Sequence, residues 1–434
     1  MLDLLLRRFP LLTALVHRDF RLYWSGHAVA VAGQQMAIVT QMWLIFDLTG
    51  SALQLGLLGL ARAVPGIIMN LVGGVLADKF DQRKLLIGAS TVTALLFATL
   101  GILTFSGRVE VWHVLAVVFG TGACEAFMQP SRQALFPNLI DRQHMMSAVG
   151  LNSAVHPGTR IFAPLVAGLL IDRVGMGLEG AATALFVISG LTLVFTFALL
   201  WVRVPPIRRA AAGGGFQTMV EGLGYVANSR IFLLIILTSF SNAFFGGGHM
   251  ILLPVFADKL LGEASGTSLA VLSSAGGVGG LTGAVIGGSL GRFRRHGWLI
   301  VGGSLSFGGS LVLFALAPWF WLLVAMEWIA SASNQLFNVT SQATLHALVP
   351  DEFRGRVMGL RSMMHSVAQP LGGLQMGGVA SVIGATAAVV ISAGCLLTVT
   401  TLGIARDGRV RNLSGAFGRS SQPPAPVAVA EAGS

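Results

Sequence analysis

Residues 73–84 read Gly-Gly-Val-Leu-Ala-Asp-Lys-Phe-Asp-Gln-Arg-Lys and place a dense group of charges between two long apolar stretches. Before this group, residues 52–77 carry one formal charge, on Arg62, and after it residues 85–107 carry none. A helix needs roughly 20 apolar residues to cross about 30 Å of hydrocarbon. Residues 73–84 therefore predict a short hydrophilic turn between two membrane-spanning helices.

The charges of this turn suggest a gate. Asp78 is expected to face a helix N-terminus, where the positive end of the helix dipole favours an anion. Arg83 and Lys84 can pair with carboxylates or with anionic lipid head groups. We expect these three residues to hold the cytoplasmic side closed in one conformational state. The alternative is an ordinary charged turn that only fixes the orientation of the helices.

The composition is typical of a protein that lies mostly inside a bilayer. The chain has 434 residues, of which 54% are hydrophobic and 11% are charged, whereas a soluble domain has about 25% charged residues. The formal charge is +10, but the basic residues fall in small groups between apolar stretches, which argues against a nucleic-acid-binding face. Cys124 and Cys395 lie inside apolar stretches and predict neither a disulfide framework nor a metal site.

The hydropathy pattern predicts an all-α integral membrane protein with twelve transmembrane helices. These spans lie near residues 22–46, 53–77, 85–106, 111–131, 146–171, 181–202, 231–257, 267–291, 297–317, 319–342, 357–382 and 384–405. Of the 28 Lys and Arg residues, only Arg108, Arg173 and Lys259 fall on the side opposite the termini, and Arg62 and Arg160 fall within spans. The positive-inside rule then predicts a multi-pass protein of the inner or plasma membrane with both termini in the cytoplasm.

A weak internal repeat divides the chain into two halves. The segment Gln133–Ile140 after the fourth span is echoed by Gln342–Val349 after the tenth. Two pseudo-symmetric six-helix bundles are therefore expected, as in transporters built from repeats. The predicted parts are an N-terminal bundle, a cytoplasmic linker with a short interfacial helix, a C-terminal bundle and a disordered cytoplasmic tail, at residues 1–203, 204–230, 231–406 and 407–434.

The turn also resembles the signature loop between helices 2 and 3 of the major facilitator superfamily of transporters. The matching residues are Gly74, Leu76, Ala77, Asp78, Lys79, Asp81, Arg83 and Lys84, with Asp81 where a glycine is usual. Residues 62–65, 130–137 and 350–357 resemble one branch, that of the enterobactin exporter and macrolide-efflux proteins. The resemblance covers nearly the whole chain. It implies a twelve-helix fold, alternating access and export of drugs or siderophores driven by protons.

Four charged residues within the predicted spans are candidates for proton coupling, because charge in hydrocarbon is costly. They are Glu125, Glu327, Arg160 and Arg62. A low dielectric favours the protonated form of a carboxyl group, and a nearby arginine opposes this, so moving the arginine would switch proton occupancy. Glu125 with Arg160 or Arg62 is the preferred set. The alternatives are a static ion pair between helices, or a pair of Glu125 with Arg83.

Residues 158–168 read Gly-Thr-Arg-Ile-Phe-Ala-Pro-Leu-Val-Ala-Gly and are similar to the antiporter motif of the superfamily, although Ala163 stands where the motif has glycine before the proline. Pro164 frees a backbone carbonyl, and small residues such as Gly168 let helices approach and slide. We expect both residues to act in gating, and the resemblance implies export as the direction of transport. The alternative is a kink that serves packing alone.

Polar and aromatic residues in the middle of spans are candidates for a substrate cavity, because amides and rings suit amphiphilic ligands. The candidates are Gln34, Trp43, Phe127, Gln129, Asn152, Asn242, Phe245, Asn334 and Gln369. Each is equally well explained as a polar or packing contact between helices. His249 and His365 could relay protons, although a packing role is favoured for each of them.

These features predict a secondary transporter that exports small amphiphilic molecules, of drug, macrolide or siderophore type, by proton antiport. Its expected partners are that substrate, protons and membrane lipids, with no nucleic acid, no metal and no cofactor, and it is expected to be a monomer. The alternatives are a lipid or solute carrier without proton coupling, or a membrane sensor that does not transport. Residues 287–291 match G-x-S-x-G of hydrolases, but that motif needs a strand before its turn, so an enzyme is not expected.

Overall fold

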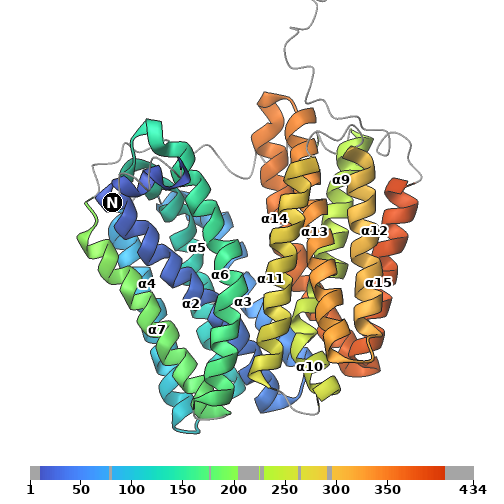
Figure 1. Cartoon of the computed structure of the whole chain (residues 1–434), viewed down its shortest axis with the longest axis horizontal. Helices are drawn as coiled ribbons and strands as arrows, with labels where there is room; N and C mark the ends of the chain where they lie inside the picture. The colour runs from blue at the N-terminus through green and yellow to red at the C-terminus, as the bar shows by residue number, and fades with distance from the viewer. Residues whose placement is uncertain are drawn as a thin grey trace, which may run out of the picture.

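The computed structural model describes residues 10–77, 81–174, 177–203, 224, 229–261, 265–290 and 296–405, and every regular element in these ranges is helical. The helices form two bundles that stand side by side (Figure 1). The N-terminal bundle contains α2 (Arg18–Thr49), α3 (Ala52–Ala77), α4 (Gln82–Phe105), α5 (Val111–Leu135), α6 (Met145–Arg173) and α7 (Leu178–Trp201). The predicted interfacial helix and the predicted tail lie outside the described residues.

The C-terminal bundle also has six spans, the first of which is interrupted. Its elements are α9 (Arg230–Ser241) continued by α10 (Leu253–Leu261), then α11 (Gly266–Ser289), α12 (His296–Ala315), α13 (Phe320–Leu348), α14 (Asp351–Ile383) and α15 (Ala385–Val399). The prediction of twelve helices in two bundles of six is confirmed. Within each bundle the connections between successive spans are short, so neighbouring spans run in opposite directions.

Nine of the described spans are long and apolar enough to cross a membrane by composition alone. In α3, Ala52–Ile68 is also an apolar helix. The helices α13 and α14 have 29 and 33 residues, so each is longer than about 40 Å at 1.5 Å per residue. Both helices carry polar side chains, such as Glu327 and Gln369, that line the cavity between the bundles.

The seventh span is not the regular helix that the sequence predicts over 231–257. Between α9 and α10 lie a π-helical turn, η4 (Asn242–Gly246), and a 3-10 helix, η5 (Gly247–Leu252). A Cβ atom on Gly248 would lie 2.7 Å from the carbonyl oxygen of Gly372 in α14. Only glycine allows this approach. The prediction is therefore wrong in the middle of the span, and turns of this kind are frequent at functional sites.

The bundles contact each other at the end of the molecule away from the N-terminus, where α6 packs against α11 and α3 against α14 (Figure 1). A Cβ atom on Gly168 would lie 2.5 Å from the carbonyl oxygen of Gly266. The carboxylate of Asp172 on α6 accepts hydrogen bonds from Ser265 Oγ at 2.7 Å and from the backbone N–H groups of Gly266 and Thr267 at 2.9 and 2.7 Å. This contact is therefore both closely packed and polar.

The clusters of buried apolar side chains also show that the bundles meet at one end only. The largest cluster of buried apolar side chains extends through both bundles and includes Leu55 of α3 and Phe256 of α10. Nearer the N-terminus, a separate cluster that includes Phe20 and Phe195 belongs to the N-terminal bundle alone. The two bundles are thus joined at one end, and at the other end each has its own core.

The turn between α3 and α4 is described from Asp81 onward, so Asp78 lies outside the described residues. Asp81 is the N-cap of α4, and its side chain accepts a hydrogen bond from the backbone N–H of Arg83 at 2.9 Å. The Arg83 guanidinium donates to the carbonyl oxygen of Leu199 at 2.8 Å, near the C-terminus of α7, where a helix dipole favours a cation. Lys84 is exposed. Arg83 therefore holds α4 to α7 within one bundle.

Candidate functional site

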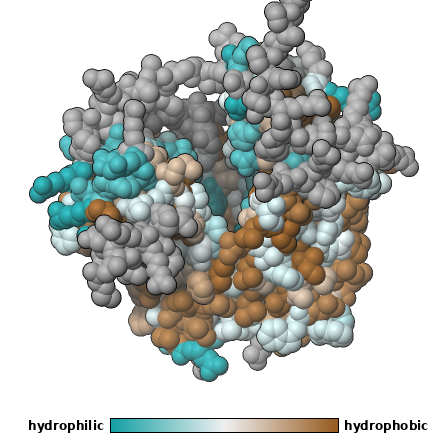
Figure 2. All heavy atoms as spheres, turned by 45° about the horizontal axis from the view of Figure 1, so that its top comes forward, coloured by the Kyte–Doolittle hydropathy of each residue, from teal (hydrophilic) through white to brown (hydrophobic). Residues whose placement is uncertain are grey.

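A cavity of about 410 Å³ lies between the two bundles. Figure 2 shows the molecule hollowed between the bundles on the side that carries the N-terminus, with hydrophilic residues around the hollow and apolar residues on the outer faces. The polar residues of the cavity wall are Gln35, Arg62, Arg160, Ser273, Glu327 and Gln369. The apolar part of the wall includes Ile38, Met42, Leu55, Leu58 and Ile251, and Pro164 of α6 also lies in the wall.

A second cavity of about 480 Å³ lies inside the N-terminal bundle. Its polar wall includes Gln34, Arg62, Glu125, Gln129 and Arg132. Arg62 lines both cavities, so they adjoin at this side chain. The Arg62 guanidinium donates a hydrogen bond of 2.7 Å to Gln41 Oε1, which fixes α3 against α2 at the boundary of the two cavities.

The ion-pair partner of Glu125 is Arg132, and not Arg62, Arg160 or Arg83 as the sequence suggested. Both residues belong to α5, and their side chains are 35% and 8% exposed. Arg132 also donates to Gln129 Oε1 at 3.1 Å. The expected pairing is wrong because the fourth span was predicted to end at residue 131, which placed Arg132 in a cytoplasmic turn. In the structure α5 continues to Leu135 and carries Arg132 into the bundle.

Glu327 lies on α13 and is only 1% exposed. Its Oε2 atom is 3.0 Å from His249 Nε2, and its Oε1 atom accepts a hydrogen bond of 3.0 Å from Ser331 Oγ. The His249 ring lies 6.0 Å from the Phe307 ring and 5.9 Å from the Phe314 ring, measured between centroids. The carboxyl group and the imidazole thus form a pair that apolar neighbours shield from water.

Hydrogen-bond chemistry restricts the protonation of this pair. His249 Nδ1 lies 2.6 Å from the carbonyl oxygen of Gly246, and a carbonyl oxygen only accepts, so Nδ1 carries a hydrogen atom. The contact between Nε2 and Glu327 then needs one more proton, held either by the imidazole or by the carboxyl group. Without this proton, a lone pair of Nε2 would face a carboxylate. The pair is therefore a site that holds one exchangeable proton.

Arg160 connects this pair to the other bundle. It belongs to α6, yet its Nη2 atom lies 3.5 Å from Met250 Sδ, next to His249 in η5. The position that a Cβ atom on Gly276 would occupy is 2.7 Å from Glu327 Oε1 and 3.7 Å from Arg160 Nη2. Glycine at this point of α11 leaves space for both charged groups. Their separation depends on how the two bundles sit against each other.

The predicted substrate residues divide into two groups. Gln34 and Gln129 line the second cavity, and Gln369 lines the first. The other six lie outside the walls of these two cavities and are Trp43, Phe127, Asn152, Asn242, Phe245 and Asn334. Asn242, for example, is 2% exposed and its amide donates to Thr238 O and Ser304 Oγ at 2.9 and 3.0 Å.

The structure gives His249 a charged partner, whereas the sequence favours a packing role for this residue. A signal for it was present: His249 follows three consecutive glycines in the middle of an apolar span. Such a run weakens a regular helix, and a histidine beside it within the membrane is expected to have a polar partner. The identity of that partner, 78 positions away in the sequence, was not readable from the run itself.

Comparison with known proteins agrees with this architecture. The family described as "Transmembrane secretion effector" (MFS_3) matches residues 11–429. Macrolide efflux protein A of Streptococcus pyogenes is 26% identical over 362 residues, which cover 81% of this chain and 87% of that protein. The enterobactin exporter EntS of Shigella boydii serotype 18 is 25% identical over 387 residues, with coverages of 87% and 86%.

Solved structures of transporters share the fold. A bacterial homologue of the iron transporter ferroportin, in an inward-facing state, has a TM-score of 0.72 at 14% identity and covers 89% of this chain and 98% of its own. The nucleoside transporter NupG has a TM-score of 0.71 at 15% identity, with coverages of 89% and 98%. The chain is thus a multi-pass membrane transporter with efflux proteins among its relatives. It belongs to the transmembrane secretion effector family of the major facilitator superfamily.

Proposed function

We propose that this chain exports small amphiphilic molecules in exchange for protons, and that Glu327 with His249 carries the proton. The observation that carries this proposal is the buried 3.0 Å contact between Glu327 Oε2 and His249 Nε2, which needs one shared proton and lies beside the cavity between the bundles. Arg160 approaches the pair from the other bundle. These three residues therefore couple the protonation of the Glu327–His249 pair to the relative position of the two bundles.

The cavity supports a drug-sized amphiphilic substrate. Its volume of about 410 Å³ lies within the range of roughly 300–1,000 Å³ that is usual for ligand pockets. Aliphatic side chains form much of its wall, and the amides of Gln35 and Gln369 offer hydrogen bonds. Relatives described as a macrolide efflux protein and an enterobactin exporter favour a substrate of drug, macrolide or siderophore type.

The proposed direction is outward across the inner or plasma membrane. The positive-inside rule assigns the end with the N-terminus, where the basic residues gather, to the cytoplasm. The cavity would then be open to the cytoplasm and closed to the outside by the contact around Gly168 and Asp172. The protein would act as a monomer in contact with lipids, with its linker at 204–230 and its tail at 407–434 in the cytoplasm.

In the proposed cycle, substrate and proton alternate at one site. A proton that arrives from outside joins His249 Nε2 to Glu327 Oε2. On the cytoplasmic side this proton leaves, and the lone pair of Nε2 then repels the carboxylate, which turns toward the Arg160 guanidinium. Substrate entering the cavity beside Arg160 favours this deprotonated arrangement. Opening toward the outside separates Arg160 from Glu327 and restores the affinity for a proton.

We assign the remaining candidate residues to gating and support. Pro164 and Gly168 allow α6 to bend and to slide against α11. Asp78, together with Arg83 and Lys84, closes the cytoplasmic side in the outward-open state. Glu125 and Arg62, which line the second cavity, hold the N-terminal bundle in shape and contact substrate rather than carry the coupled proton.

The proposal is tested by reconstitution into liposomes that contain a pH-sensitive dye. A panel of amphiphilic drugs and siderophores is added under an imposed proton gradient. We expect the wild type to show proton flux that depends on one class of substrate. In Glu327→Gln this flux is expected to fall on the order of 100-fold. Glu125→Gln, the matched change in the other bundle, is expected to keep at least half of the wild-type flux.

Three outcomes would contradict the proposal. Wild-type proton flux in Glu327→Gln would remove the role of this carboxyl group. Substrate movement without any proton flux would indicate a carrier of the same fold that is not coupled to protons, and an absence of both fluxes across the panel would favour a membrane sensor.

A further inference from the structure

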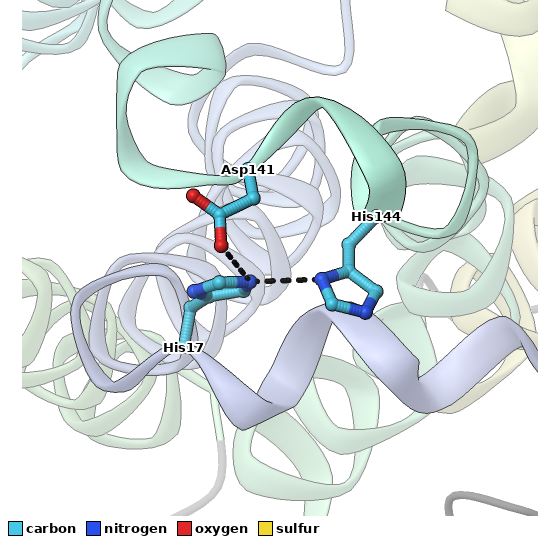
Figure 3. A group of neighbouring side chains, drawn as sticks. All are labelled: His17, Asp141 and His144. Carbon is cyan, nitrogen blue, oxygen red and sulfur yellow. Dashed lines mark hydrogen bonds and ion pairs between the residues drawn. The ribbon is translucent and has the colours of Figure 1, made fainter.

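Two histidines and an aspartate meet at the end of the N-terminal bundle that carries the N-terminus (Figure 3). His17 is the N-cap residue of α2 and follows the 3-10 helix η1 (Pro10–Val16). Asp141 and His144 lie in the connection from α5 to α6, and His144 is the N-cap residue of α6. These three residues lie outside the walls of both cavities, so the transport site does not account for them.

Backbone hydrogen bonds hold the cluster from both sides. The His17 N–H donates to the carbonyl oxygen of Ala14 at 3.2 Å, and the His144 N–H donates to the carbonyl oxygen of Asp141 at 3.0 Å. The Ala14 N–H donates to Ser147 Oγ at 3.1 Å, which ties η1 to the first turn of α6. These hydrogen bonds hold the segments that carry the three side chains close together without using those side chains.

The three side-chain atoms converge on one point. His17 Nε2 lies 3.0 Å from His144 Nδ1 and 3.7 Å from Asp141 Oδ2, and all three ligand atoms lie within 4.8 Å of one another. In a tetrahedral zinc site with bonds of about 2.0–2.2 Å, two ligand atoms are roughly 3.4 Å apart. The observed separations lie on both sides of this value, so small rotations of the rings bring the three atoms to a metal ion.

We propose that His17, Asp141 and His144 form a binding site for a divalent transition metal ion with the preferences of Zn²⁺. Two imidazole nitrogens and one carboxylate oxygen suit Zn²⁺ and its neighbours in the transition series. They do not suit Mg²⁺ or Ca²⁺, which take oxygen ligands. The Asp141 side chain is 68% exposed, so an ion can enter from solvent and keep water as its fourth ligand.

Without an ion, a proton fills the same place. One of the two facing rings must donate an N–H and the other must accept it, because two protonated rings would repel each other. A metal ion needs the lone pairs of both facing nitrogens, so the donating ring moves its hydrogen atom to its other nitrogen when the ion binds. Protons compete with the metal ion for these nitrogens.

The ion would link the starts of two helices that reach the transport site. From His17, α2 continues to Gln35 in the wall of the first cavity, and from His144, α6 continues to Arg160. Because the ion binds the folded arrangement, it stabilises the N-terminal bundle, and the stabilisation grows with the logarithm of the ion concentration above the Kd. Metal binding is thus readable in two ways, by calorimetry and by thermal unfolding.

The test uses the full-length protein in detergent, purified without a histidine tag and treated with a chelator. ZnCl₂ is titrated into the protein in a calorimeter, with MgCl₂ as the comparison. We expect one equivalent of Zn²⁺ to bind, no binding of Mg²⁺, and at least about tenfold weaker Zn²⁺ binding in His17→Gln and in His144→Gln. His346→Gln, a change at an exposed histidine near the end of α13, is the matched control and is expected to bind like the wild type.

Thermal unfolding separates loss of the site from loss of the fold. Zn²⁺ is expected to raise the Tm of the wild type and of His346→Gln but not of the two cluster variants. Asp141→Asn changes an exposed side chain and tests the site even where a histidine variant does not fold. Equal Zn²⁺ binding in the wild type and in the cluster variants, or an absence of Zn²⁺ binding in the wild type, would overturn the proposal.

Discussion

Two membrane carboxylates, Glu327 and Glu125, are both paired with a basic side chain, but the partners differ. Glu327 is paired with His249 and both side chains are at most 2% exposed, whereas Glu125 is paired with Arg132 and is 35% exposed. An arginine stays protonated under all ordinary conditions, so its pair with Glu125 is a fixed one. A histidine can lose its proton, so its pair with Glu327 can change charge state.

The pairs also differ in how they respond to motion. Glu125 and Arg132 belong to the same helix, so their separation does not change when the bundles move. Glu327 and His249 lie in the C-terminal bundle, but Arg160 reaches them from the N-terminal bundle. Burial of a carboxylate alone therefore does not mark a coupling site. A partner that can titrate and a charge that moves relative to the pair are also needed.

The largest expected effect comes from His249→Gln. The amide can still donate a hydrogen bond to Glu327, but it cannot hold and release a proton. We expect substrate-linked proton flux in liposomes to fall about 100-fold, and the remaining transport to lose its dependence on pH. His365→Gln, at a partly buried histidine on α14, is the control. A wild-type pH profile in His249→Gln would mean that the His249–Glu327 pair, like the Arg132–Glu125 pair, does not change charge state during transport.

A smaller effect is expected for Asp172→Asn, at a third carboxylate whose partners are Ser265 and two backbone N–H groups across the bundle contact. The amide loses one acceptor oxygen, which removes roughly 1 kcal/mol from the closed outer contact and shifts the conformational equilibrium about fivefold. The measurement is the rate at which a reagent applied from outside labels a cysteine introduced at Ile38 in the cavity wall. This rate is expected to rise, because the outer contact is weakened. An unchanged rate would mean that this contact does not hold the outer side closed.

The smallest effect on transport is expected for Arg132→Gln. It leaves Glu125 without its cation, so we expect the Tm to fall by about 2–4 °C, while proton coupling persists. In the double variant with Glu125→Gln most of the lost stability should return, because no carboxylate remains unpaired. Loss of coupling in Arg132→Gln, with stability unchanged, would make the Glu125 pair the functional one.

Sequence reasoning located several site residues and misassigned their contacts. Glu327 and Arg160 were selected because charge is rare within spans, and both do line the cavity between the bundles. Glu125 was given the wrong partner because the predicted end of its helix was one turn short of Leu135. A side chain that lies one helical turn beyond a predicted helix end is easily assigned to the cytoplasm instead of the helix bundle. An error of this size is within the usual uncertainty of helix ends.

The candidate metal cluster illustrates the same limit. His17 and His144 are separated by 127 positions, and each lies in a short polar segment between helices. No spacing motif links them, because the connection between them is made by the packing of η1 against α6. Only Asp141 and His144, three residues apart, share a turn that local sequence could suggest.

The sequence by itself determined the number of spans, the bias of positive charge and the family. The length of an apolar stretch and the position of a charge are local properties of the chain, and the bilayer responds to each of them directly. The tertiary structure alone decided that α9 breaks before His249, that Glu327 meets this histidine, and that Arg160 reaches both from the opposite bundle. These contacts join residues far apart in the chain. They depend on close helix approaches at glycines such as Gly248 and Gly276, whose partners no local pattern specifies.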